Sequence, residues 1–212
     1  MKPRIAAIVL SSLLITFVSN AQQFDGGMHA GIVGSEVDGD ILGGMNKLGI
    51  FAGVYTGLQI SKKAGFQLEL DYFQKGSQDN ADFESGDYST YKMKADYLEV
   101  PVLFQFRPLE WLQLEAGPSM ALLVNAKEYI DGNEQSLFAE FKPVTFNAIV
   151  GANFEFIRNL SVNVRFDTSL DPIREEDFTG NVKRFPFFKY GQYHNCLVLS
   201  LRYRFLRIGT IR

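Results

Sequence analysis

The sequence predicts an all-β protein, an eight-stranded antiparallel up-and-down transmembrane β-barrel. Eight segments alternate apolar with polar residues, as in residues 66–72, and on a pleated strand this alternation puts the two kinds of side chain on opposite faces. The segments that join them are alternately long and short. One strand face is therefore suited to lipid and the other to the lumen, and all short turns are expected at one end of the barrel.

The first residues predict an export signal. Lys2 and Arg4 form a basic start, residues 5–18 are an apolar run, and residues 19–21 are the small or polar residues of a cleavage site. The apolar run is shorter than the roughly 20 residues of a membrane-spanning helix, which disfavours an anchor. We therefore expect residues 1–21 to be a signal peptide and residues 22–212 to form one outer-membrane barrel domain.

Composition excludes two further possibilities. The chain has 21 basic and 24 acidic residues and a formal net charge of −3, which argues against a nucleic-acid partner. Cys196 is the only cysteine of the sequence, so an intramolecular disulfide is impossible. Stability must come from strand pairing and packing.

The alternating pattern also gives the order of elements. The expected strands are residues 24–34, 47–61, 66–75, 92–107, 112–125, 141–156, 160–170 and 190–205. The short joins are residues 62–65, 108–111 and 157–159, and the long ones are residues 35–46, 76–91, 126–140 and 171–189. By analogy with outer-membrane barrels, the long loops should be extracellular and both mature termini periplasmic. Pro101 and Pro118 lie inside strands, where the missing N–H predicts a bulge or kink.

The outward positions of this pattern carry no charge, as expected of a lipid-facing surface, because Arg or Lys near the midplane costs roughly 2 to 4 kcal/mol. Aromatic residues near the short turns resemble an interfacial girdle. They are Phe66, Phe104, Phe106, Trp111, Phe154, Phe156, Tyr203 and Phe205. A soluble sandwich would also alternate, but it would have no reason to separate long loops from short turns.

The inward positions carry the charges. They are Glu69, Asp71, Glu99, Glu115, Glu155, Arg165, Asp167, Arg202 and Arg204. Since an eight-stranded barrel is only wide enough for its side chains to fill it, we expect a paired network around Arg165 and Arg202. A proton or ion pathway is the alternative.

Catalytic and metal-binding patterns are weak. His29 and His194 are both expected to face inward, about six residues or roughly 20 Å apart, which is too far for one site. Ser200 could approach His29, but inside the lumen, away from any lipid substrate. The sequence therefore predicts no enzyme, no cofactor and no metal site.

The long loops leave two binding possibilities open. They are rich in acidic residues, so calcium binding is an alternative, although no loop has EF-hand spacing. Basic loop residues could contact lipopolysaccharide phosphates or a protein partner. They are Arg174, Lys183, Arg184 and Lys189.

Three motifs resemble the PorT-like outer-membrane β-barrel proteins of Bacteroidetes. They are GFQLELDYFQKG at residues 65–76, YLEVPVLF at 97–104 and LEAGP at 114–118, and residues 195–205 agree with the last strand of that family. The resemblance implies an outer-membrane barrel, often labelled porin-like, in a family whose founding members are needed for type IX secretion and gliding. Residues 206–212 depart from the family pattern because they follow the terminal aromatic strand.

Two hypotheses for the function follow. The first is a structural or interaction component with a filled narrow lumen, accessory to type IX secretion or gliding; the alternative is a small-solute porin or channel. Lumen size separates them, since barrels of roughly 16 to 18 strands leave an aqueous channel and eight strands do not. The expected partners are outer-membrane lipid, lipopolysaccharide, the barrel-assembly machinery and secretion or surface proteins.

Overall fold

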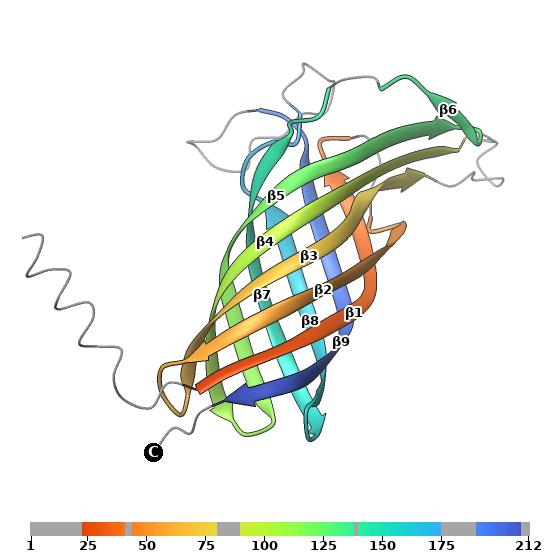
Figure 1. Ribbon diagram of the computed structural model, residues 1–212. Helices are drawn as coiled ribbons and strands as arrows, with labels where there is room; N and C mark the ends of the chain where they lie inside the picture. The colour runs from red at the N-terminus through yellow and green to blue at the C-terminus, as the bar shows by residue number, and fades with distance from the viewer. Residues whose placement is uncertain (1–22, 41–43, 80–89, 138–139, 175–189, 209–212) are drawn as a thin grey trace, which may run out of the picture.

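The chain forms a closed antiparallel β-barrel (Figure 1). The computed structural model describes residues 23–40, 44–79, 90–137, 140–174 and 190–208. The strands are β1 (Gln23–Asp38), β2 (Lys47–Gln59), β3 (Ala64–Asp79), β4 (Tyr91–Leu109), β5 (Leu112–Ile130), β6 (Asn133–Gln135), β7 (Val144–Ile157), β8 (Leu160–Ser169) and β9 (Tyr193–Ile208). Among these residues, eight strands form the wall, and β6 pairs only with the end of β5.

Neighbouring strands of the wall follow chain order, and β1 pairs with β9 to close the sheet, with His29 opposite Arg202. The predicted fold class, an eight-stranded up-and-down barrel, is confirmed. The turns between β2 and β3, β4 and β5, and β7 and β8 lie at the same end as the start of β1 and the end of β9 (Figure 1). We call this the turn end and the opposite one the loop end. No helix among the described residues is long and apolar enough to cross a membrane.

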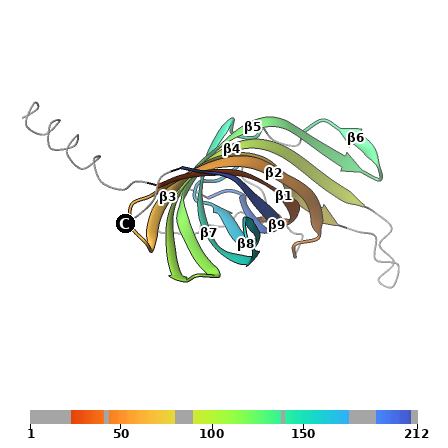
Figure 2. The ribbon, with the colours of Figure 1, turned by 60° about the horizontal axis from the view of Figure 1, so that its bottom comes forward.

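The predicted strand boundaries differ most at the loop end. There β1 continues to Asp38, β3 to Asp79 and β5 to Ile130. These ends lack the apolar alternation of the lipid-facing part, yet their backbones still pair. As a result, β4, β5 and β6 extend beyond the barrel (Figures 1 and 2).

Strand β6 was not predicted, although its turn has a clear signal in the sequence. Asp131 and Gly132 have φ of 50° and 77° and join Ile130 directly to its partner Asn133. A two-residue Asp-Gly turn with both φ positive is the preferred connection of a tight hairpin.

The two strand prolines do not form bulges, so the bulge alternative of that prediction was wrong. Pro101 stays opposite Ser119, and the irregularities of the β4–β5 pair lie at Asp96/Tyr97 and Phe106/Leu109 instead. Beside Pro101, the β3–β4 pairing passes from Val102 to Glu99 without a change of register. The proline therefore costs ladder hydrogen bonds but inserts no extra residue.

The chain beyond Phe205 was expected to follow the last strand, but β9 continues to Ile208. Leu206 lies opposite Gly26 and Arg207 opposite Asp25, after a register shift between Gly26 and Gly27. The departure from the family pattern therefore lengthens the strand that closes the barrel.

The two faces of the wall differ as the alternation predicts. Every residue assigned to lipid contact is exposed or half-buried, including Leu48, Val150 and Leu201. The opposite positions are mostly buried in the lumen. Glycine is required at Gly53, because a Cβ there would lie 2.0 Å from Asp71 Oδ1 and 2.7 Å from His29 Nε2.

Apolar side chains also enter the lumen, in two groups. One is a layer in the barrel interior that contains Val33, Phe51, Phe73, Ala95, Tyr97, Ala121, Cys196 and Val198. The second group, at the loop end, contains Val37, Met93, Phe141 and Ile173. We call the first group the aromatic layer; it includes Cys196 as a buried wall residue.

Candidate functional site

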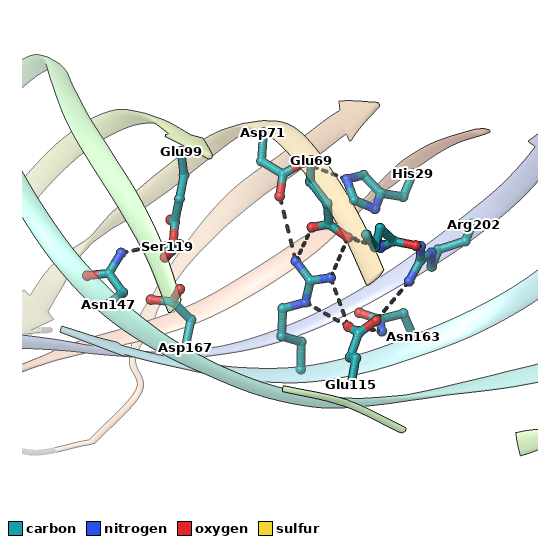
Figure 3. A network of polar contacts seen from close by, with 12 residues as sticks. His29, Glu69, Asp71, Glu99, Glu115, Ser119, Asn147, Asn163, Asp167 and Arg202 are labelled. Carbon is teal, nitrogen blue, oxygen red and sulfur yellow. Dashed lines mark hydrogen bonds and ion pairs between the residues drawn. The ribbon is translucent and has the colours of Figure 1, made fainter. Parts of the chain in front are cut away.

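Arg165 on β8 joins two other strands across the lumen, through Glu69 and Glu115, which Figure 3 labels. Its Nη1 and Nη2 donate to the two oxygens of Glu69 on β3, at 2.7 and 2.9 Å. Its Nε and Nη2 donate to Oε1 of Glu115 on β5, at 3.0 and 2.8 Å. Asp71 Oδ2 lies 3.6 Å from Nη1. The Arg165 guanidinium thus binds carboxylates from two sides of a narrow lumen. The side chains of Arg165, Glu69, Asp71 and Glu115 are all buried.

Arg202 on β9 completes this group. Its Nη1 donates to Glu115 Oε2 at 3.0 Å and its Nη2 to Gln67 Oε1 at 2.7 Å. The guanidinium also lies 4.3 Å from the centre of the Tyr55 ring. We call Glu69, Asp71, Glu115, Arg165 and Arg202 the arginine cluster.

Neutral donors fill the remaining acceptor positions of this cluster. Asn153 and Asn163 donate to the two Glu115 oxygens at 2.8 and 2.9 Å. Gln67 donates to Glu69. Because Glu69 and Glu115 each accept several hydrogen bonds, the cost of burying their charges is offset where they lie.

A second group lies nearer the loop end. Lys75 Nζ lies 2.7 Å from Asp167 Oδ1 and 3.0 Å from Glu99 Oε2. Ser119 and Asn147 also donate to Glu99 (Figure 3). We call Lys75, Glu99 and Asp167 the lysine cluster. Lys75 was not predicted to face the lumen, although it has the same strand parity as Glu69 and Asp71.

The remaining two residues of the predicted lumen set pair separately, towards the turn end. Arg204 Nη2 donates to Glu155 Oε1 at 2.8 Å, and the side chains are 11% and 28% exposed. This pair is partly solvated, so it contributes less than the buried clusters.

His29 belongs to the lumen wall rather than to a catalytic pair. A 2.7 Å hydrogen bond joins its Nε2 to Asp71 Oδ1. Ser200 lies opposite Gly31, so Arg202 rather than Ser200 is the residue opposite His29. His194 lies opposite Val37, so the histidines are eight residues apart along β9 rather than the predicted six.

His29, Glu69 and Asp71 together could present three ligand atoms to a metal ion, since these atoms lie within 4.8 Å of one another. However, Arg165 donates to both Glu69 oxygens and lies beside Asp71. The guanidinium therefore already supplies the positive charge that a cation would bring, and the residues do not fit a metal site.

The loop end of the lumen is covered by residues from two long connections. Arg174 Nη1 donates to Glu128 Oε1 at 2.9 Å, and its guanidinium lies 4.7 Å from the centre of the Phe141 ring. Ile173 is fully buried beside them. Arg174 is therefore unsuited to the lipopolysaccharide contact considered from sequence; Lys183, Arg184 and Lys189 lie outside the described residues.

The eight aromatic residues assigned to the girdle are all exposed on the outer face near the turn end. Phe66 and Phe104 form an edge-to-face pair on neighbouring strands, with ring centroids 5.6 Å apart. Trp111 stacks on Phe154 with a centroid distance of 6.2 Å. Such amphipathic belts are typical of membrane interfaces.

Comparisons with known proteins agree with this architecture. The crystal structure of Ail, the attachment invasion locus protein of Yersinia pestis, aligns over 88% of this chain and 99% of its own at 14% identity, with a TM-score of 0.50. Neisserial surface protein A aligns over 86% of this chain and 97% of its own at 10% identity, with a TM-score of 0.47. At 14% identity the likeness to Ail concerns the fold alone.

No curated protein sequence matches the chain significantly. The family model described as the outer membrane protein beta-barrel domain matches residues 20–175, which is most of the chain. The protein therefore belongs to the outer membrane protein β-barrel domain family.

Proposed function

We propose that this outer-membrane protein is a non-conducting barrel that acts as a structural or interaction component, and that its role is accessory to type IX secretion or gliding. The observation that carries the first part is the arginine cluster, in which Arg165 bonds to carboxylates of β3 and β5 across the lumen. The second part rests on the resemblance to PorT-like proteins.

The aromatic layer supports a closed lumen. Phe51 and Phe73 pack edge to face with ring centroids 5.2 Å apart, and both are almost fully buried. Hydrated ions would have to pass this apolar layer as well as the charges, and an eight-stranded barrel has little width to spare.

The proposed orientation places the loop end outside the cell and both mature termini in the periplasm, after removal of residues 1–21. It is supported by the separation of short turns from long connections and by the ends of β1 and β9, which lie with the turns (Figure 1). In this orientation the extension formed by β4, β5 and β6 projects outside the cell. It offers a protein partner a surface beyond the lipid.

Conductance in planar bilayers tests the closed lumen. Purified mature protein should give little or no steady current. The Arg202→Ala variant should lose roughly 2 kcal/mol of unfolding free energy, because Glu115 loses a charged donor, and should still open no pore of porin size. A large, reproducible current from the unmodified protein would overturn the proposal and favour a small-solute porin.

A deletion strain tests the cellular role. Loss of secreted type IX cargo, restored by the full chain but not by a chain lacking the hairpin residues 131–136, would support a role through the loop end. Normal secretion and gliding in the deletion strain would remove that role and leave the barrel as a structural component only.

A further inference from the structure

A groove of about 500 Å³ crosses the loop ends of β3, β4 and β5. Gln78, Lys92 and Tyr129 lie in one cross-strand row of its lining. Lys94 lies in the next row, between Gly76 and Lys127. Lys92 and Lys94 have the same strand parity as the lipid-facing residues of β4, so the groove continues the outer face of the barrel. We call it the lysine groove.

The charges of this groove are poorly balanced by the protein. Lys94 and Lys127 stand directly opposite each other on β4 and β5, an arrangement that destabilises an antiparallel pair. Lys127 is compensated by Glu134, which lies 2.8 Å from its Nζ and raises its pKa. Lys92 and Lys94, in contrast, form no ion pair or side-chain hydrogen bond with another described residue.

A third lysine, Lys47, lies near the groove but is buried, and its Nζ donates to Leu48 O at 3.0 Å. The side chain of Lys47 lies against Gly76, since a Cβ on this glycine would be 3.4 Å from Lys47 Cε. Lys92 and Lys94 are electrostatic neighbours of Lys47. Among the described residues, Asp79 is the acidic residue in the lining and Asp96 is a further acidic neighbour of Lys94 and Lys47, but neither forms an ion pair with these lysines.

The position of the groove indicates what it meets. Towards the barrel centre, the next polar group is Asp96, which accepts hydrogen bonds from Gln74 at 3.0 Å and Asn125 at 3.4 Å. Beyond it come the exposed apolar residues Leu98 and Leu122. The lysine ammonium groups therefore lie just outside the hydrocarbon boundary, at the depth of lipid headgroups.

We propose that the lysine groove binds a phosphate of a phosphorylated glycolipid in the outer leaflet, with Lys92 and Lys94 contacting the phosphate. Two ammonium groups that form no ion pair with the part of the chain that the structure describes suit a phosphate, which accepts charge-assisted hydrogen bonds. The inference rests on the proposed orientation, in which the loop end faces outwards. Lys92 and Lys94 thus take the place of Arg174, which is buried, as the basic residues that contact lipopolysaccharide.

Native mass spectrometry of the full mature chain in detergent micelles tests this site. The probe is phosphorylated lipid A, and dephosphorylated lipid A and phosphatidylglycerol are tested in parallel. The Lys92→Gln/Lys94→Gln variant should bind phosphorylated lipid A at least about tenfold more weakly than the unmodified protein. The matched control is Lys62→Gln/Lys63→Gln, which removes two exposed lysines at the turn end and should bind as the unmodified protein does.

Several outcomes would overturn the assignment. They are equal binding by the groove variant, equal binding of dephosphorylated lipid A, an equal loss in the turn-end control, or equal affinity for phosphatidylglycerol. Heat-dependent gel migration verifies folding, and if the double variant fails to fold, Lys92→Gln and Lys94→Gln are compared singly with Lys62→Gln by the same criteria. Steady conductance would overturn the closed lumen without affecting this result, whereas a non-conducting barrel that binds no lipid A would overturn the groove alone.

Discussion

The arginine cluster and the lysine cluster hold buried carboxylates in different ways. In the first, Arg165 donates through three nitrogens to carboxylates of two strands. In the second, the single Nζ of Lys75 lies between Glu99 and Asp167 and 4.3 Å from the centre of the Phe73 ring. The planar guanidinium of Arg165 thus joins strands across the lumen, whereas the compact ammonium group of Lys75 fits the small space beside the aromatic layer.

The difference indicates how much Arg165 and Lys75 each contribute to the free energy of unfolding. Arg165 makes four hydrogen bonds to Glu69 and Glu115. Without it, Glu115 keeps Arg202 and Glu69 keeps Gln67 as a donor. Lys75 makes two ion pairs, and Glu99 also accepts hydrogen bonds from Ser119 and Asn147. Loss of the lysine therefore removes fewer charged contacts than loss of Arg165.

The largest effect is expected for Arg165→Met, which removes four charge-assisted hydrogen bonds to Glu69 and Glu115. We expect a loss of about 3 to 5 kcal/mol in unfolding free energy. Urea titration of protein refolded into vesicles, followed by Trp111 fluorescence, measures it.

The double variant Arg165→Met/Glu69→Leu is the matched control. Since it also removes the carboxylate that loses its bidentate partner, it should be more stable than Arg165→Met alone. If the second substitution only adds to the loss, Arg165 and Glu69 are not coupled and the comparison of the clusters fails.

Lys75→Met should have a smaller effect, about 2 kcal/mol, because neutral donors still serve Glu99. The same urea titration applies. Lys75→Met/Asp167→Asn should recover part of the loss. A Lys75→Met protein less stable than Arg165→Met would reverse the ranking drawn from the contacts.

Arg204→Ala should have the smallest effect, below about 1 kcal/mol, because its partner Glu155 is partly exposed to water. The urea midpoint in low and high salt measures it, and the small loss should shrink further as salt screens the pair. A loss as large as that of Lys75→Met would place this pair in a drier environment than its exposure indicates.

The fold class was predictable because one property, period-2 alternation, is repeated in every wall strand and agrees with the lengths of the connections. Alternation also assigned Arg165 and Glu69 to the lumen. It could not rank their partners, because these lie 96 residues apart and their contact depends on the register of strands between them. Those registers are set by turns and bulges that alternation does not determine.

The misses have separate physical causes. Lys75 lies at the end of an alternating segment, where a long aliphatic stem allows a lysine to be either inside or at the surface. Arg174 lies in a connection rich in polar residues, and its burial depends on Phe141 and Glu128 from two other parts of the chain. Neither contact has a local sequence signal.

The pairing of β1 with β9 has a consequence for the order of folding. Because Arg202 lies on the strand that closes the sheet, and Arg165 on the strand beside it, their bonds to Glu115 and Glu69 form only when the two ends of the chain meet. Until then these side chains remain hydrated, and closure must remove their water in one late step. Contacts between residues so distant in sequence slow folding. The open barrel should therefore be a long-lived intermediate, and sealing of its β1–β9 seam should determine the rate of assembly.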